Sequence, residues 1–151
     1  MEDSGTQLIK LGKEDAQTFV KLILLFNEVF ETGKTTVPAE SYLKALLQKP
    51  GFIVLVVKHK NEIAGGLTAF ELPMYDAERS EIFIYDVGIK KEFQRQGFGK
   101  KLIEELKNYC KESGIKEFFV PAHEEDEHAL DFYKSCGGKG EKVVHFNFLM
   151  D

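Results

Sequence analysis

Cysteine is scarce in this sequence, with only Cys110 and Cys136 among 151 residues. Two cysteines cannot form a disulfide framework, and no cysteine or histidine pair has zinc-finger spacing. We therefore expect free thiols, no metal site and a cytoplasmic location.

Long hydrophobic runs are also missing. No window approaches the roughly 18 uncharged apolar residues that a membrane span needs, and the first ten residues lack the pattern of a secretion signal. No membrane partner is therefore expected. The 43% hydrophobic and 30% charged residues are ordinary for a globular protein, and we expect a single domain over residues 1–151.

A basic excess, the usual mark of a nucleic-acid binder, is absent: 20 basic residues face 25 acidic ones, a net charge of −5. No nucleic-acid partner is expected. The charge is nevertheless uneven, because residues 90–101 carry +4 and residues 123–131 carry −5. These are either two solvated surface segments, as charge runs usually are, or one site for an anion and one for a cation.

Hydrophobic periodicity and turn residues predict alternating strands and helices. Hairpin-linked strands imply antiparallel pairs, and the strand–helix–strand passage over 81–120 implies a parallel pair with a right-handed crossover. The fold class is therefore α/β with a mixed sheet. The expected strands are 7–11, 52–58, 63–72, 81–89, 115–120 and 142–149, and the expected helices are 13–31, 38–48, 97–112 and 127–135.

Two glycines, Gly97 and Gly99, lie between the strongest predicted strand and the most periodic helix. Glycine lets the backbone approach a ligand closely, and a helix start offers unpaired N–H donors that favour phosphate. The segment matches neither the Walker loop nor the dinucleotide fingerprint. From this pattern alone it is either a phosphate-binding loop or a glycine-bearing turn with ordinary surface lysines.

The pattern Gln-x-x-Gly-x-Gly over 94–99 resembles the acyl-CoA pyrophosphate loop of the GCN5-related N-acetyltransferase (GNAT) superfamily. The helix reading Ala-Leu-Asp-Phe-Tyr-Lys-Ser-Cys-Gly over 129–137 resembles the second motif of that superfamily, in which a tyrosine lies near the CoA sulfur. The resemblance implies a GNAT-type acyl-CoA N-acyltransferase fold, with a central mixed, mostly antiparallel sheet flanked by about four helices. It also implies acetyl-CoA as co-substrate.

Segments 52–55, 69–73, 79–87 and 144–146 narrow the resemblance to the type I aminoglycoside 3-N-acetyltransferases. Such enzymes imply a small-molecule amine as substrate and a link to antibiotic resistance. His123 stands where these enzymes have an acidic residue, which leaves the preferred amine open.

The resemblance implies a cofactor-binding set on the strand end and the glycine loop. These residues are Val87, Gly88, Ile89, Gln94, Arg95, Gln96, Gly97, Phe98, Gly99 and Lys100.

Three residues are candidates for catalysis. Asp86 interrupts an apolar strand, where a buried carboxylate is costly unless paired; it either holds a neighbouring group of the protein or faces the acceptor amine. Glu81 begins the same strand and is a second candidate base, acting through water. Tyr133 is either a core aromatic or, as the family implies, a donor to the departing CoA sulfur.

The acidic residues Glu124, Glu125 and Asp126 precede the helix of Tyr133. They either stabilise the start of that helix or, with Asp86, attract a polycationic substrate.

The expected function is acetyl-CoA-dependent N-acetylation of a polycationic small molecule, the 3-amino group of an aminoglycoside, by direct attack in a ternary complex. The alternatives are an acetyltransferase for a polyamine or a peptide N-terminus, and a non-catalytic acyl-CoA-binding sensor. A homodimer is left open.

Overall fold

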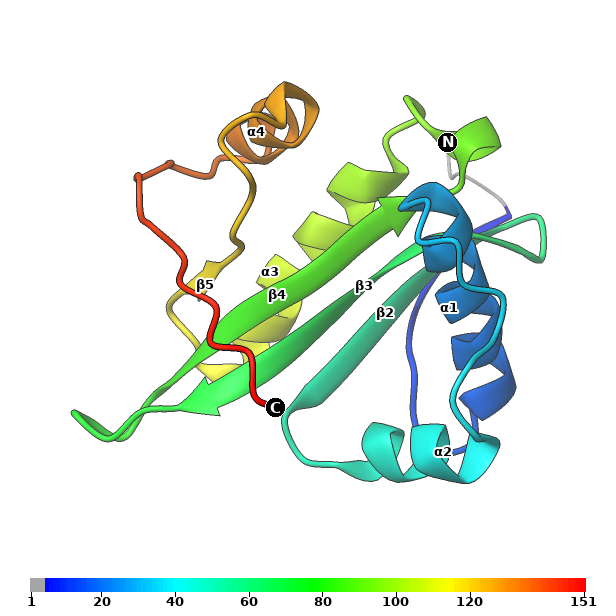
Figure 1. Cartoon of the computed structure of the whole chain (residues 1–151), viewed down its shortest axis with the longest axis horizontal. Coiled ribbons are helices and arrows are strands. Elements are labelled where there is room, and N and C mark those ends of the chain that lie inside the picture. The colour runs from blue at the N-terminus through cyan, green and yellow to red at the C-terminus, as the bar shows by residue number, and fades with distance from the viewer. Residues whose placement is uncertain (1–4) are drawn as a thin grey trace. The chain divides into compact units, whose positions relative to one another are not determined.

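The computed structural model describes residues 5–151 and contains one five-stranded sheet in the order β1-β2-β3-β4-β5 (Figure 1). Neighbouring strands are antiparallel except for the parallel pair β4 and β5. The predicted α/β class with a mixed, mostly antiparallel sheet and four helices is therefore confirmed. The elements are β1 (Thr6–Lys10), α1 (Ala16–Val29), α2 (Glu40–Gln48), β2 (Phe52–His59), β3 (Glu62–Pro73), β4 (Ser80–Ile89), the short 3-10 helix η1 (Lys91–Phe93), α3 (Phe98–Ser113), β5 (Phe118–Phe119) and α4 (Glu127–Ser135).

Contacts divide the chain into two compact units, one ending at Pro121 and one running from Ala122 to Asp151. The first unit holds the sheet and helices α1 to α3, and the second holds α4. Within residues 5–151, no helix is both long and apolar enough to cross a membrane.

The sheet of the first unit is covered on both faces. Figure 1 shows α1 and α2 in front of the sheet and α3 behind it. The apolar run from Ile53 to Val57 in β2 is at most 2% exposed because both of its faces are covered. Gly66 in β3 allows α1 to approach closely, since a Cβ there would lie 2.6 Å from a methyl carbon of Leu22.

The turn between β2 and β3 has a backbone suited to a tight hairpin. Its two central residues, Lys60 and Asn61, have φ of 52° and 67°. Left-handed backbone at both central positions matches the right-handed twist of the flanking strands. The predicted hairpin at this point is confirmed.

One predicted element, the strand over 142–149, is wrong. These residues form no strand, and β5 is shorter than its predicted range of 115–120. A strand needs backbone partners as well as a suitable sequence, and the described sheet ends at β5. The large apolar side chains of this segment lie at the surface, from Val143, 74% exposed, to Leu149, 92% exposed.

Candidate active site

The glycine loop is held in shape by its own glutamines. The side-chain amide of Gln94 donates to the carbonyl oxygen of Ile89 at 2.9 Å, and that of Gln96 donates to the carbonyl oxygen of Glu92 at 3.2 Å. Gly97 follows as the N-cap of α3, with φ of 87°. The sequence therefore supplies glutamine to brace the loop and glycine to make its left-handed turn.

The start of α3 is suited to binding an anion. No side chain caps this helix end, and its first turn contains no acidic residue. A Cβ on Gly97 would meet nothing within 4 Å, so the space beside the loop is open. A groove of about 620 Å³ borders it and is lined in part by Gln96, Gly97 and Lys100. Unpaired N–H donors, the positive end of a 16-residue helix and nearby lysines together favour phosphate groups.

The end of β4 offers backbone groups to a ligand. Within the described sheet β5 pairs with β4 only at Ile82 and Phe83. Beyond Phe83, the edge of β4 that faces β5 has no strand partner up to Ile89. Val87, Gly88 and Ile89, on this stretch, can therefore pair with amide groups of a ligand. The predicted cofactor-binding residues thus form one continuous path from β4 through the loop into α3.

Asp86 lies on the face of the sheet that α1 covers. It stands opposite Thr68, and two residues further along β4 a Cβ on Gly88 would lie 3.0 Å from the ring of Phe26 in α1. Partial burial raises the pKa of Asp86 above its ordinary value because the charged form loses water. No ion pair to Asp86 forms within residues 5–151. Its carboxylate therefore lacks the lysine partner that a purely structural role would supply.

Glu81, the other candidate base, is bound by an arginine and lies far from Asp86. The guanidinium Nη1 of Arg79 donates to its carboxylate at 2.7 Å, while Nη2 of Arg79 donates to Asp76 at 3.1 Å. Glu81 is also five residues before Asp86, roughly 15 Å along an extended strand. The structure does not bring the two carboxylates together. Sequence reasoning missed Arg79, which lies just before β4 and only two residues from Glu81.

Two of the three predicted acidic residues of the second unit have local partners. The Asp126 side chain accepts a hydrogen bond from the Ala129 N–H at 3.1 Å and so caps α4. Glu124 pairs with Lys142 at 3.6 Å across an exposed surface. Glu125 is exposed. The interpretation that these acidic residues stabilise the start of α4 therefore has direct support at Asp126.

Tyr133 lies on α4 with a partly buried side chain. Its ring meets that of Phe132 edge to face at 5.1 Å between centroids. The predicted helix carrying this tyrosine begins and ends where the structure has it.

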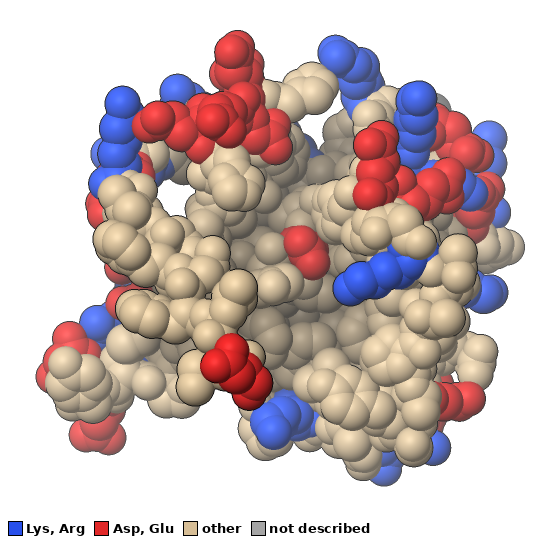
Figure 2. All heavy atoms as spheres, viewed as in Figure 1, with Lys and Arg blue, Asp and Glu red and all other residues tan. Residues whose placement is uncertain are grey.

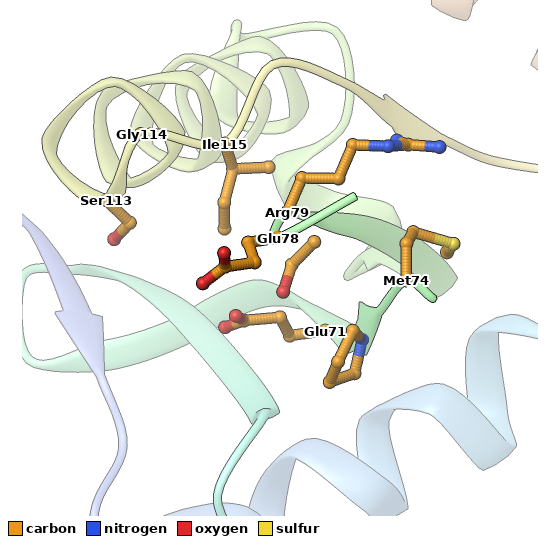
Figure 3. Close-up of a pocket in the computed structure, with 9 residues that line it drawn as sticks. Glu71, Met74, Glu78, Arg79, Ser113, Gly114 and Ile115 are labelled. Atoms are coloured by element: carbon orange, nitrogen blue, oxygen red, sulfur yellow. The ribbon is translucent and has the colours of Figure 1, made fainter. Parts of the chain in front are cut away.

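A separate cavity of about 400 Å³ lies at the other end of α3 (Figure 3). The carboxylates of Glu71 and Glu78 and the hydroxyl of Ser113 are directed into it, whereas the Arg79 guanidinium points away. The 16 residues of α3 place this cavity about 24 Å from the glycine loop. None of the predicted site residues lines it.

Comparison with known proteins agrees with this arrangement. The model of the acetyltransferase (GNAT) family matches residues 19–138. Among solved structures, the aminoglycoside acetyltransferase meta-AAC0020 from an uncultured soil metagenomic sample, in complex with trehalose, is 38% identical with a TM-score of 0.94, covering 99% of each chain. The same enzyme has been solved in complex with sisomicin, with a TM-score of 0.95.

A second aminoglycoside acetyltransferase from an uncultured soil metagenomic sample, HMB0005, is 34% identical with a TM-score of 0.91, covering 97% of this chain and 99% of that one. The enzyme AAC(6')-Iy, in complex with a CoA-containing bisubstrate analog, shares the fold at 14% identity and a TM-score of 0.78, covering 97% of this chain and 100% of that one. The chain therefore belongs to the acetyltransferase (GNAT) family, and the protein is an N-acetyltransferase.

Proposed function

We propose that this N-acetyltransferase transfers the acetyl group of acetyl-CoA to the 3-amino group of an aminoglycoside, by direct attack in a ternary complex. One observation carries the proposal. A single stretch of chain carries in succession the Asp86 carboxylate, which forms no ion pair within residues 5–151, the open edge of β4 and the uncapped start of α3. The likeness to meta-AAC0020 supports an aminoglycoside as the acceptor.

The residues present fit acetyl-CoA as co-substrate. Backbone groups of Val87 to Ile89 would hold its amide-bearing arm and polarise the thioester carbonyl. The loop at Gly97 and the α3 N-terminus would hold its phosphates. When bound, acetyl-CoA supplies the activated acetyl group.

Asp86 is the proposed acceptor of the amine proton, directly or through water. The amine must lose a proton before it can attack, and a carboxylate with a raised pKa is a better base than an ordinary one. Glu81 is the less favourable candidate because Arg79 already binds its carboxylate. Tyr133 is proposed, from the family motif, to donate a hydrogen bond to the departing thiolate.

A covalent intermediate on cysteine is not part of the proposal. Both thiols are buried, and burial raises the pKa of Cys110, which keeps that thiol protonated. Buried thiols outside any disulfide are also typical of a reducing compartment, and we propose a cytoplasmic location. The family match over residues 19–138 crosses the boundary at Pro121, which supports one domain over residues 1–151.

A homodimer is proposed on separate grounds. The segment 142–149 leaves large apolar side chains at the surface, including Phe146 at 74% and Phe148 at 85% exposure. Several large apolar side chains exposed within one short segment are a common feature of interaction sites. Light scattering on the purified protein should give twice the mass of one chain, and the double variant Phe146→Ser/Phe148→Ser should give a monomer.

A panel of amines assayed for CoA release tests the function. Aminoglycosides with a free 3-amino group should be the fastest substrates, and NMR of the product should place the acetyl group on that nitrogen. Expression in a susceptible bacterium should raise the inhibitory concentration of the same compounds. Turnover confined to polyamines or peptide N-termini, or acetyl-CoA binding without turnover on any amine, would refute the proposal.

A further inference from the structure

Tyr85 and Asp86 are consecutive in β4, yet their side chains lie on one face of the sheet. The register with β3 passes from Thr68 opposite Asp86 to Ala69 opposite Ile84, so Tyr85 is the extra residue of a β-bulge. Asp86 lies on the same face as its partner Thr68. Phe70 is two residues after Thr68 and so lies on that face too, together with its own partner Phe83. The Tyr85 ring contacts the rings of Phe70 and Phe83, which places it on the same face.

The rings on this face are ordered by their neighbours. Tyr85 meets Phe70 edge to face at 6.4 Å and 89°, and meets Phe83 at 6.0 Å and 77°. Phe83 in turn stacks on Phe119 of β5 at 5.2 Å and 10°. These contacts restrict the orientation of the Tyr85 ring on the face that also carries Asp86.

Tyr85 is nevertheless a surface residue. Its side chain is 63% exposed, against 37% for Phe70. Much of its ring is therefore accessible to a ligand. In Figure 2, viewed from the side of α1, most of the Lys, Arg, Asp and Glu side chains lie towards the edges of the view.

Among residues 5–151, the Asp86 carboxylate on this face has no oppositely charged partner. The Asp86 carboxylate is partly buried, and no ion pair reaches it within the described part of the chain. A partly desolvated carboxylate next to an exposed, fixed tyrosine ring offers two kinds of attraction to organic cations. The carboxylate attracts them by charge, and the ring face attracts them by its quadrupole.

We propose that Tyr85 and Asp86 form a two-part site for an organic polycation, in which the tyrosine ring binds one ammonium group and the carboxylate binds another. This inference rests on the proposed function and makes Tyr85 a specificity-determining residue of the acceptor site. A molecule with several ammonium groups uses both parts, whereas a monoamine uses one. The β-bulge places Tyr85 and Asp86 on the same face of the sheet.

Calorimetric titration with sisomicin, without acetyl-CoA, tests the site directly. Tyr85→Leu should weaken binding by about fivefold or more, because it removes the ring face. Tyr85→Phe keeps the ring and should stay within about twofold of the wild type. Tyr42→Leu is the matched control, since Tyr42 is 61% exposed on α2, and it should bind as the wild type does.

Binding of the monoamine glucosamine should change less than that of sisomicin in Tyr85→Leu. Acetyl-CoA affinity and the melting temperature should stay constant across all three variants. Wild-type sisomicin affinity in Tyr85→Leu overturns the inference, and so does an equal loss in Tyr85→Phe, which would assign binding to the hydroxyl. Tyr85-dependent sisomicin binding with no amine acetylated would refute the proposed function and leave this site standing.

Discussion

Gly97 and Gly114 flank α3 with nearly the same left-handed backbone, at φ of 87° and 73°, and a Cβ on either would meet nothing within 4 Å. The two positions therefore carry the same conformational demand at opposite ends of one helix. Only Gly97 belongs to the loop that we propose as the phosphate site.

This symmetry gives a controlled test of the loop. Gly97→Val and Gly114→Val should each cost about 1–2 kcal/mol of stability, because an L-residue is strained in the left-handed region. Acetyl-CoA should raise the melting temperature of the wild type and of Gly114→Val by mass action. It should not raise that of Gly97→Val, and a retained shift there would count against the loop assignment.

Asp86→Asn tests the base. The variant keeps the shape of the side chain and should still bind acetyl-CoA, but it should lose most amine-dependent CoA release. In the wild type, kcat/KM should fall as the pH drops through the raised pKa of Asp86, which lies above the ordinary carboxyl value. Any residual activity of Asp86→Asn should not show this fall in kcat/KM at low pH. Turnover equal to that of the wild type would mean that Asp86 has only a structural role.

The same substitution makes a prediction about stability. A raised pKa in the folded state means that the contribution of Asp86 is fully present below the unfolded value of 3.8 and is lost as the pH rises through the folded pKa. Asp86→Asn should therefore melt above the wild type at pH 7, with a gap that closes towards pH 4. Asp76 supplies a control of opposite sign, since the hydrogen bond from Arg79 lowers its pKa, and Asp76→Asn should not stabilise the protein at pH 7.

Tyr133→Phe tests the leaving group. The variant should lower kcat by about tenfold, the scale of one hydrogen bond to a charged group, and leave acetyl-CoA affinity unchanged. Tyr75→Phe, at a fully exposed tyrosine in the first unit, is the control and should be silent. Equal kcat in the wild type and Tyr133→Phe would make Tyr133 a packing residue only.

The acidic segment needs a variant that separates charge from helix capping. Asparagine caps helices as well as aspartate does, so Glu125→Gln/Asp126→Asn removes two charges and preserves the cap on Ala129. If the segment steers polycations, the KM for a tetra-amine should rise more than that for a monoamine, and less so at high salt. Asp126→Ala should instead lower the melting temperature, as loss of a cap costs about 1 kcal/mol.

Most elements of the fold could be predicted because their signals are local. Helix α4 follows from its apolar spacing and the acids before it, and α3 from its stripe and its flanking glycines. The segment 142–149 has the composition of a strand, but pairing is not a local property. No described strand pairs with it.

The candidate site could be proposed from the sequence where it depends on one segment, but not where it depends on the pairing register between strands. The spacing of Gln94, Gly97 and Gly99 made this segment a candidate loop, and the family resemblance favoured phosphate binding there. The shared face of Tyr85 and Asp86 could not be predicted in this way, because regular alternation puts neighbours on opposite faces and only the pairing with β3 shows the bulge. The contact between Arg79 and Glu81, which favours Asp86 as the proposed base, likewise depends on the folded structure.

The hairpin at Lys60 and Asn61 bears on how readily this enzyme can change its acceptor. Lysine and asparagine occupy left-handed positions for which Asn-Gly is the preferred pair. Lys60→Asn/Asn61→Gly should relieve that strain, leaving a reserve of stability that can absorb the cost of new substitutions around Asp86. A variant with this turn could accept substitutions that change the acceptor amine without unfolding, so the turn is a useful first step for directed evolution of the enzyme.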